Sequence, residues 1–428
     1  MAPLAEDLRF RGLVHQMTDT ALEGRLDNDH LTVYSGFDPT ADSLHVGHLL
    51  QICTLRRMQL GGHHPIALAG GGTGFIGDPG GKSTERALLT PEELAHNVQA
   101  IRSQLERFLD FGAEAGDARA TVADNSDWLA GMGLFDFLRD VGKHFTVNQM
   151  VSKDSVKARL DREGEGISFT EFSYMLLQAY DFLRLFDDQD CRLQIGGSDQ
   201  WGNITMGIDL VRKVRHAEVW GLTSPLVLKG DGTKFGKSET GTVWLDATRT
   251  SPYQLYQFLV RCEDSVVGSY LRYFTFLPHD QLVALDATTA EHPERRDAQR
   301  VLAREVCTLV HGPAETERAE RAASALFGEA IVELDEPTLL EVFAEAPSSP
   351  VPRARMEADD LPLIDLLVET GLMPSKGRAR TTVEQGGVYV NNRRETDIDR
   401  RLGSNDLLAG GYVVLRRGRK DYHLLRFI

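Results

Sequence analysis

Two histidines near the amino terminus stand at a spacing that could bind phosphate. The segment His45-Val46-Gly47-His48 follows a short β-type run, Leu31–Gly36, and a turn that contains Pro39. Residues three positions apart share one face of a helix, so a helix that begins here directs two imidazoles and the unpaired amides of its first turn toward one point. Such a point suits an anion, and Gly47 allows a large planar ligand to approach the backbone. Zinc is a poor alternative because no third ligand is evident.

A second basic segment occurs about 190 residues further along the chain. It reads Lys234-Phe235-Gly236-Lys237-Ser238 and lies in a loop punctuated by Gly230, Gly232 and Gly241. Two lysines on a hinged loop can close over a phosphate when one binds. Either segment alone is often ordinary exposed surface, but their joint occurrence in an α/β chain favours a nucleotide site.

A glycine-rich segment adds a third candidate. Gly72–Gly77 matches G-x-G-x-x-G directly after an apolar run, which would suit a dinucleotide-binding fold. That fold requires a helix immediately after the glycines, whereas the next clear helix begins near Pro91. The pattern therefore predicts a glycine-rich loop with Asp78 at its base and with Lys82 and Arg86 in or just beyond it. A solvated loop with ordinary surface charges fits the same segment equally well.

The elements around these segments alternate between strand and helix over the first 230 residues. Apolar runs at Leu31–Gly36, His64–Gly70 and Gln194–Gly197 end at glycines, and the pattern of residues 91–111 is helical. Thr90 is placed as the N-cap of that helix, with Glu93 as its capping-box partner. Alternating units of this kind predict a mostly parallel, doubly wound α/β sheet, which binds ligands at the carboxyl ends of its strands.

Composition predicts further domains beyond the sheet. Residues 250–330 are helical in pattern, and residues 346–362 contain four prolines, which suits a linker. Two short helices and strands near residues 387–391 and 412–416 follow. We expect a Rossmann-like catalytic domain at 1–248 with an inserted connective segment at about 112–165, an α-helical domain at 249–330, a linker at 331–360 and a small α+β domain at 361–428.

Charge is distributed unevenly along the 428 residues. The formal net charge is −16, yet residues 374–428 hold 12 Lys/Arg against 6 Asp/Glu. A basic tail on an acidic body suggests that the tail meets a polyanion. The chain has no apolar run long enough to cross a bilayer, and its four cysteines form no C-x-x-C pair. We expect a soluble intracellular protein without a disulfide framework or a cysteine zinc site.

Together these segments resemble a known family. Tyr34–Thr40 running into the histidine segment, with the later Lys234–Ser238, resembles the two signatures of class I aminoacyl-tRNA synthetases. The segments Phe169–Asp181 and Gln194–Asn203 narrow the similarity to the bacterial tyrosyl-tRNA synthetase family. It covers nearly the whole chain, including a tail similar to the S4-type RNA-binding domain. Val46 replaces the usual isoleucine, and Phe235-Gly236 stands where the wider class has Met-Ser, but the charged residues are kept.

The resemblance implies that the chain activates L-tyrosine with ATP and then transfers the tyrosyl group to the 3′ end of tRNA(Tyr). The substrate carboxylate attacks the α-phosphorus, so the enzyme acts by positioning and charge stabilisation rather than through a covalent nucleophile. The resemblance implies catalytic roles on the triphosphate and pyrophosphate for Thr40, His45, His48, Lys82, Arg86, Lys234 and Lys237. It implies ATP contacts for Gly36, Asp38, Gly47, Gly197, Asp199, Lys237 and Ser238.

For the amino acid, Tyr174, Gln178 and Asp181 are spaced to lie on one helix face. The resemblance assigns Tyr34 and Asp181 to the phenolic hydroxyl and Gln200 to the carboxylate end. It assigns Asp78, Tyr174 and Gln178 to the ammonium group. In the tail it implies RNA contacts for Lys376, Arg378, Arg380, Arg393 and Arg394. It also implies Mg²⁺ accompanying ATP, no structural metal, a homodimer, a cytoplasmic location and no membrane partner.

Two other hypotheses are compatible with parts of the pattern. One is the tryptophan-specific relative or another H-x-G-H nucleotidyltransferase, in which Tyr34 and Asp181 would not select a phenol. The other is a non-catalytic RNA-binding protein built on a synthetase scaffold. Such a protein should have lost catalytic groups, yet His45, His48 and Lys237 are all present.

Overall fold

The computed structural model describes residues 2–78, 89–153, 156–157, 160, 166–233, 235–238, 241–325, 329–344, 346–358, 360–418 and 421–428, with only the backbone of 237, 238, 329 and 330. The chain divides into two compact units, Met1–Val310 and His311–Ile428.

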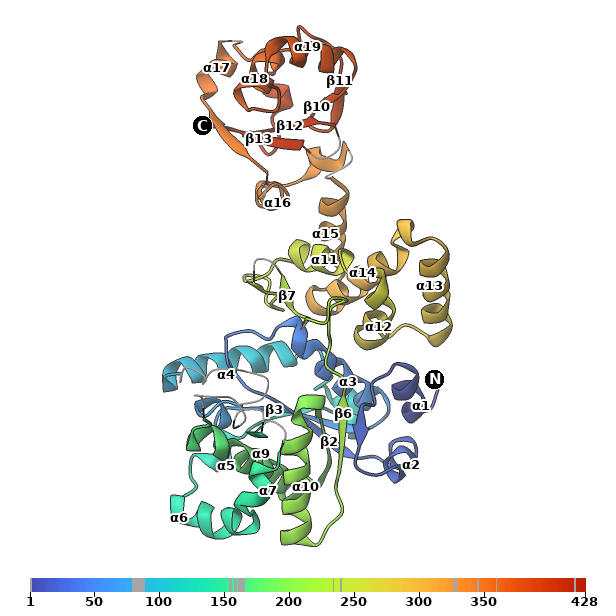
Figure 1. Cartoon of the computed structure of the whole chain (residues 1–428), viewed down its shortest axis with the longest axis vertical. Coiled ribbons are helices and arrows are strands. Elements are labelled where there is room, and N and C mark those ends of the chain that lie inside the picture. The colour runs from blue at the N-terminus through green and yellow to red at the C-terminus, as the bar shows by residue number, and fades with distance from the viewer. Residues whose placement is uncertain are drawn as a thin grey trace. The chain divides into compact units, whose positions relative to one another are not determined.

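The first unit is built on a six-stranded sheet (Figure 1). Its spatial order is β1-β6-β5-β2-β3-β4. The bounds are β1 Gln16–Met17, β2 Thr32–Phe37, β3 His64–Ala69, β4 Thr121–Asp124, β5 Cys191–Gly197 and β6 Trp220–Ser224. All neighbouring pairs are parallel except β1 with β6. The predicted doubly wound parallel sheet is therefore confirmed, and the strands predicted near residues 31, 64 and 194 are the three adjacent strands β2, β3 and β5.

Helices cover both faces of this sheet. Tyr34, Ile66 and Leu68 point from the sheet into a core shared with α9 (Phe169–Gln189) and α10 (Trp201–Arg215). The helix α3 (Leu49–Leu60) packs on β2, β3 and β5 from the other face. The predicted helix after Thr90 is α4 (Pro91–Leu105), and the Thr90–Glu93 capping box is present. These helices leave the carboxyl ends of the strands open.

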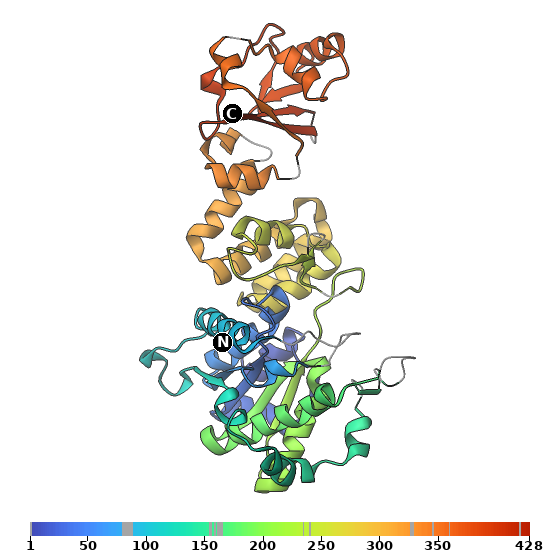
Figure 2. The ribbon, with the colours of Figure 1, turned by 90° about the vertical axis from the view of Figure 1, so that its left-hand side faces the viewer.

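The remaining elements of the first unit lie before, between and after the strands. The short ones are α1 Leu4–Phe10, α2 Ala21–Asn28, η1 Val46–His48, η2 Thr73–Phe75, η3 Ala113–Ala118, α5 Ser126–Leu129, α6 Leu134–Asp136, η4 Phe137–Val141, η5 Gly142–His144, α7 Val147–Val151, η6 Ser198–Gln200, β7 Lys237–Ser238 and β8 Gly241–Thr242. The predicted helical region contains α11 Pro252–Val260, α12 Asp264–Phe274, α13 His279–Glu291, η7 Pro293–Arg295 and α14 Asp297–His311 (Figure 2).

The second unit folds around a five-stranded sheet of order β11-β10-β12-β13-β9. Its strands are β9 Ser348–Val351, β10 Val388–Val390, β11 Arg393–Glu395, β12 Tyr412–Arg417 and β13 Asp421–Phe427. Its helices are α15 Pro313–Ala325, η8 Glu329–Glu333, α16 Glu336–Val342, α17 Arg353–Glu357, α18 Leu363–Glu369, α19 Lys376–Glu384 and η9 Ser404–Asp406. Asn391 and Asn392 both have positive φ, which suits the two-residue turn between β10 and β11.

Two segments contain more structure than their sequences indicated. The segment 112–165, expected as an insertion, contributes β4 to the main sheet. The stretch 331–360, expected as a proline-rich linker, contains α16 and β9, and β9 pairs in parallel with β13. Leu339 and Phe343 in that stretch are buried in a small apolar core with β12 and β13 residues. Apolar contacts with residues that are distant in the sequence explain why these segments are ordered. The domain boundaries themselves stay a prediction.

Candidate active site

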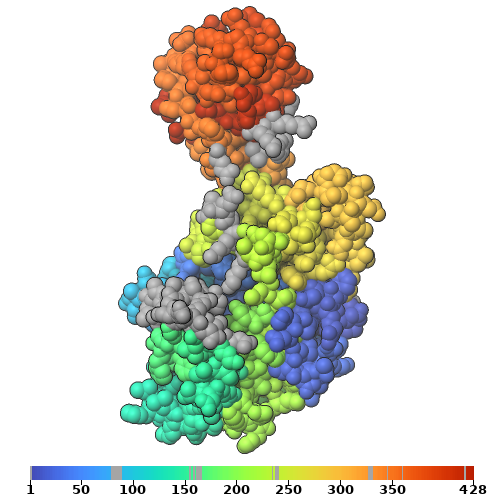
Figure 3. All heavy atoms as spheres, viewed as in Figure 1, coloured from blue at the N-terminus to red at the C-terminus, as the bar shows by residue number. Residues whose placement is uncertain are grey.

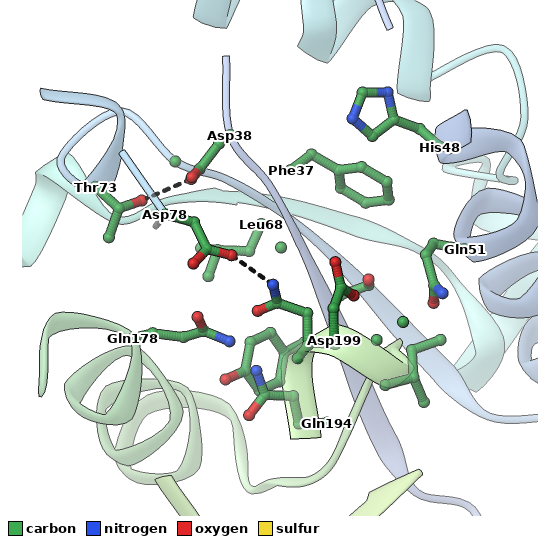
Figure 4. A pocket seen from close by; sticks show the side chains of 18 of the residues that line it. Phe37, Asp38, His48, Gln51, Leu68, Thr73, Asp78, Gln178, Gln194 and Asp199 are labelled. Atoms are coloured by element: carbon green, nitrogen blue, oxygen red, sulfur yellow. Dashed lines mark hydrogen bonds between the residues drawn. The ribbon is translucent and has the colours of Figure 1, made fainter. Parts of the chain in front are cut away.

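A cavity of about 360 Å³ opens at the carboxyl ends of the central strands. Its walls come from the ends of β2, β3 and β5, from α9 and from the loop after β6. The predicted site residues that line it are Tyr34, Gly36, Asp38, Thr40, His45, Gly47, His48, Asp78, Tyr174, Gln178, Asp181, Gly197, Asp199 and Gln200. In Figure 4, His48 lies at the end of the cavity away from Gln178 and Gln194. One cavity thus joins the groups expected to bind an amino acid to those expected to bind phosphate.

The deep end of the cavity carries two buried polar groups. Tyr34 is 1% exposed, and its hydroxyl has no hydrogen-bond partner among the described residues. Burial, with the nearby charge of Asp181, raises the pKa of Tyr34 well above its usual range. A buried hydroxyl without a partner costs about 1–3 kcal/mol. This end of the cavity is therefore suited to a ligand that brings its own polar atom.

Asp181 is held beside Tyr34 by two donors from the segment after β4. Trp128 Nε1 donates to one carboxylate oxygen at 2.8 Å, and Asn125 Nδ2 donates to the other at 3.0 Å. Burial raises the pKa of Asp181 to about 7, although these two hydrogen bonds act to lower it. The carboxyl group is therefore fixed in orientation and poised to change charge near neutral pH.

Asp38 connects the strand end to the helix that carries the amino-acid contacts. Its carboxylate accepts a hydrogen bond from the hydroxyl of Tyr174 at 2.9 Å. It also accepts one from the hydroxyl of Thr73 at 3.0 Å (Figure 4). Asn125 Nδ2 also donates to the Thr73 hydroxyl at 2.9 Å. Burial, followed by the charge of Asp38, raises the pKa of Tyr174 well above its usual range. The Tyr174 ring is thus held at the cavity wall as a neutral phenol.

A second hydrogen-bonded group lies between α9 and α10. Gln200 donates to the carboxylate of Asp78. Asn203 Nδ2 donates to the side-chain oxygen of Gln178 at 2.9 Å and to that of Gln200 at 3.2 Å. Asn203 therefore orients both glutamine amides, and Asp78 offers a carboxylate of the sign that an ammonium group needs.

The histidine segment is more closely organised than the spacing predicts. Gly47 N donates to Nδ1 of His45 at 3.0 Å, and His45 N donates to Nδ1 of His48 at 3.1 Å. The two rings stack with centroids 3.9 Å apart. The imidazoles, rather than a ligand, therefore accept the hydrogen bonds of these backbone amides at the start of the helix. Because each Nδ1 accepts, a neutral ring carries its proton on Nε2, and Nε2 is the donor that phosphate would meet.

The two basic segments, almost 190 residues apart in sequence, meet in space. Val46 N donates to Val243 O at 3.0 Å, and Val243 N donates to Gly236 O at 3.0 Å. Gly236 has φ +98°, and a β-carbon there would lie 3.4 Å from the Gly47 nitrogen. Only glycine adopts this backbone conformation without strain. The second segment is therefore packed directly on the histidine segment, as the phosphate-site hypothesis requires.

Not every predicted residue can be located. Lys82, Arg86 and Lys234 lie outside the described residues, and the side chains of Lys237 and Ser238 are not described. In the tail, Arg378, Arg380 and Arg393 are exposed. Lys376 pairs with Asp365 at 2.8 Å. Arg394 donates to the carbonyls of Gly386 and Gln385 at the end of α19, at 2.8 and 2.9 Å, and so already has a structural role.

Several cavity residues were missed from the sequence. They are Thr73, Asn125, Gln194 and the second-layer partners Trp128 and Asn203. Gln194 is buried beside Tyr34 on the neighbouring strand, and its side-chain oxygen has no partner among the described residues. Thr73 lies within the glycine-rich segment Gly72–Gly77, and Gln194 is the first residue of the segment Gln194–Asn203 that carries the family resemblance. Both therefore had a local signal in the sequence. Asn125 and Trp128 had none because the strand before them is only four residues long.

Neither a membrane span nor a metal cluster was found in the described part of the chain. None of the described helices is long and apolar enough to cross a membrane. The same residues contain no group of three or more His, Cys, Asp or Glu side chains that could hold a metal ion.

Similarity to known proteins extends along the whole chain and agrees with the resemblance seen in the sequence. Residues 26–328 match the family described as tRNA synthetases class I (W and Y), and residues 343–425 match the Tyrosine--tRNA ligase SYY-like C-terminal domain. The tyrosine--tRNA ligase of Roseiflexus castenholzii is 53% identical over 428 residues, which is all of both chains. Tyrosine--tRNA ligase 1 of Bacillus subtilis is 50% identical over 430 residues, again all of both chains.

A solved structure supports the same relationship. The C-terminally truncated mitochondrial tyrosyl-tRNA synthetase of Aspergillus nidulans superposes with a TM-score of 0.68 at 32% identity, over 76% of this chain and 95% of that one. The parallel sheet and the joined basic segments, together with these matches, define a class I aminoacyl-tRNA synthetase, an ATP-dependent ligase. The chain belongs to the tyrosine--tRNA ligase family, because its relatives over the full length carry that name. The family resemblance seen in the sequence is confirmed.

Proposed function

We propose that the cavity binds L-tyrosine with its phenolic hydroxyl between Tyr34 and Asp181. The observation that carries this assignment is the buried Tyr34 hydroxyl without a partner among the described residues, at the closed end of the cavity. A phenol would supply the missing partner, whereas phenylalanine would leave the buried polar groups unpaired. Asp181 accepts a hydrogen bond from the phenolic hydroxyl as a carboxylate, whose orientation is fixed by Asn125 and Trp128.

The other end of the amino acid meets the groups on and beside α9. Asp78, Tyr174 and Gln178 bind the ammonium group, and Gln200 binds the carboxylate end. Asp78 supplies the opposite charge, while Gln200 and Gln178 already have fixed orientations through Asn203. This arrangement aims the substrate carboxylate toward the histidine segment.

ATP binds across the strand ends with its triphosphate at the two basic segments. Gly36, Gly47 and Gly197 allow close approach, and Asp38 and Asp199 line the same wall. The tyrosine carboxylate attacks the α-phosphorus, a bond forms to its oxygen, and pyrophosphate leaves. Thr40, His45 and His48 donate to phosphate oxygens. Lys82, Arg86, Lys234 and Lys237 stabilise charge on the departing pyrophosphate, and Ser238 contacts ATP.

Mg²⁺ enters with ATP as part of the substrate. This ion prefers oxygen ligands and retains several waters, so phosphate oxygens supply most of its coordination. The cavity carboxylates Asp38 and Asp78 already accept hydrogen bonds from Tyr174 and Gln200. The protein would therefore contribute few, if any, direct ligands.

The second unit binds tRNA(Tyr) through its basic surface. Arg378 and Arg380 on α19 and Arg393 after the Asn391-Asn392 turn are exposed, and Lys376 adds charge nearby. Such groups contact phosphates rather than bases and make binding depend on salt. Arg394 stabilises the turn at the end of α19 and contributes to this surface mainly through its charge. We propose a cytoplasmic location, since the full-length relatives come from bacteria, in which ATP and tRNA are cytoplasmic.

The enzyme acts as a homodimer joined through the segment that follows β4. Exposed apolar side chains gather there, including Leu134, Phe135 and Val147, with Phe169 at the start of α9. Phe135 is 84% exposed and Phe169 is 78% exposed. In Figure 3 the residues around 135–150, in green, form part of the outer surface of the first unit. Apolar residues this exposed are typical of a surface that a partner covers, and a second copy is the partner that a homodimer supplies.

Amino-acid-dependent exchange of pyrophosphate into ATP tests the substrate assignment. Exchange should require tyrosine and should be negligible with phenylalanine or tryptophan. Tyr34→Phe should lower the preference for tyrosine over phenylalanine while leaving the ATP dependence unchanged. Exchange driven by tryptophan instead of tyrosine would refute the assignment.

A further inference from the structure

The second basic segment carries an aromatic residue that is buried outside the cavity. Phe235 is 8% exposed, although it stands between Lys234 and Lys237. Its ring lies 5.2 Å from that of Phe258 on α11, 4.7 Å from Tyr270 and 5.3 Å from Phe274, both on α12, measured between ring centroids. Three aromatic rings of the helical region therefore enclose the central side chain of a phosphate-binding segment.

The same helix holds the loop at a second point. The hydroxyl of Tyr270 donates to Leu228 O at 2.7 Å. Phe235 N donates to Val227 O at 3.0 Å, and Val227 lines the cavity. The loop between β6 and β7 is thus fixed to α12 at its beginning through Leu228 and at its end through Phe235.

α12 is also fixed to the helix that begins at His48. Arg57 on α3 is 3% exposed, and its guanidinium donates to the carbonyls of Tyr273 at 3.1 Å and Arg272 at 3.2 Å. These carbonyls belong to the last turn of α12, where a cation is favourable. One helix, α12, therefore contacts both α3, which directly follows the histidine segment, and the loop that carries the second signature.

We propose that Phe235 is a positioning residue that docks the second basic segment on α12 and so holds the backbone of Lys237 at a fixed distance from the phosphates. The inference rests on the proposed function of Lys237. A lysine side chain is long and flexible, and its charge stabilises a transition state only when its backbone is held at the correct distance. Phe235 supplies that constraint from a site that touches neither tyrosine nor ATP.

A purely structural role for Phe235 predicts a different result. If the ring were only part of the apolar core, its removal would lower stability and affect both substrates alike. If the ring positions Lys237, removal of the ring should spare tyrosine binding. It should slow adenylate formation, in which pyrophosphate leaves, and the reverse reaction, in which pyrophosphate attacks. The ratio of these two effects therefore separates the roles.

The experiment compares Phe235→Ala with Phe108→Ala in the full-length protein. Phe108 is 5% exposed near the end of α4 and has no part in the proposed site, so it is a matched control for loss of a buried ring. Tyrosine affinity is measured without ATP, and adenylate formation and its reversal by pyrophosphate are measured in single turnovers. Phe235→Ala should slow both directions about tenfold or more, with tyrosine affinity changed less than about twofold. Phe108→Ala should leave both rates within about twofold of the wild type.

Two conservative variants keep the test decisive if Phe235→Ala folds poorly. Phe235→Met retains a long apolar side chain that can fill the aromatic enclosure and should restore most of the rate. Tyr270→Phe removes only the hydrogen bond to Leu228 O and should slow pyrophosphate-dependent steps by a few-fold. Equal losses in Phe235→Ala and Phe108→Ala, or a parallel loss of tyrosine affinity, would overturn the proposal. If the wild type supported no exchange with tyrosine, the proposed function itself would fail instead.

Discussion

Replacement of Asp181 by asparagine should change how the stability of the first unit depends on pH. Burial raises the pKa of Asp181 to about 7, against an ordinary value of 3.8. Between these values the folded chain holds a proton that the unfolded chain has lost, so unfolding releases it and stability falls as pH rises. The full difference is worth about 4 kcal/mol, since each pH unit contributes about 1.36 kcal/mol.

Asp181→Asn removes this titration. Asparagine offers one acceptor oxygen to Asn125 and Trp128 where the carboxylate offers two, which lowers stability by an amount independent of pH. The stability of the variant relative to the wild type should therefore increase between pH 4 and pH 7 and level off above pH 8. For a unit of this size the increase corresponds to about 6 °C in melting temperature.

The assay is the melting temperature of both proteins across pH 4–9, followed by a signal from the first unit. The exposed Asp127→Asn is a matched control for the change of an aspartate to asparagine in the same region. The same Asp181→Asn protein should lose most of its selectivity for tyrosine over phenylalanine. A difference between Asp181→Asn and the wild type that stays flat from pH 4 to pH 8 would refute the argument from burial.

Three further changes test other parts of the structure. Asp7→Asn should destabilise the first unit by about 3 kcal/mol at pH 7, because it leaves the buried Arg11 and Arg57 without their carboxylate. Burial acts to raise the pKa of Asp7, but hydrogen bonds from His279 and Arg11 outweigh burial and lower this pKa. The difference in free energy of unfolding between the wild type and Asp7→Asn should therefore shrink as the pH falls below 4, which urea unfolding at a series of pH values measures. Gly236→Ala should slow adenylate formation measured by exchange, since the new methyl group would meet Val46 at 3.2 Å and the backbone there has φ +98°; an unchanged rate would mean that the contact between the two segments is not required. Phe135→Asp should shift the protein from dimer to monomer in sedimentation velocity, and a dimer of unchanged stability would place the interface elsewhere.

The gathering of many candidate residues at one cavity was predictable because it depends on short segments. The histidine segment and the polar face of α9 each lie within a short stretch of the chain. His45 and His48 from the first, and Tyr174, Gln178 and Asp181 from the second, line one cavity. Gly36, Gly70 and Gly197 lie at or next to the last residues of β2, β3 and β5, so the glycines marked the carboxyl edge of the sheet correctly.

The parts that were not predictable depend on contacts between distant residues. Asn125 and Trp128 reach Asp181 only because β4 joins the sheet beside β3, and a four-residue strand has too short a pattern to be recognised. The enclosure of Phe235 requires three rings from α11 and α12. The order within 331–360 arises from burial against β12 and β13, which no local composition indicates.

A crystal structure with a non-hydrolysable tyrosyl-adenylate analogue tests the central claim most directly. The account predicts the phenolic oxygen within hydrogen-bond distance of both Tyr34 and Asp181, and the phosphate group beside the Nε2 atoms of His45 and His48. An analogue bound with its ring elsewhere, or with its phosphate remote from the histidine segment, would contradict it.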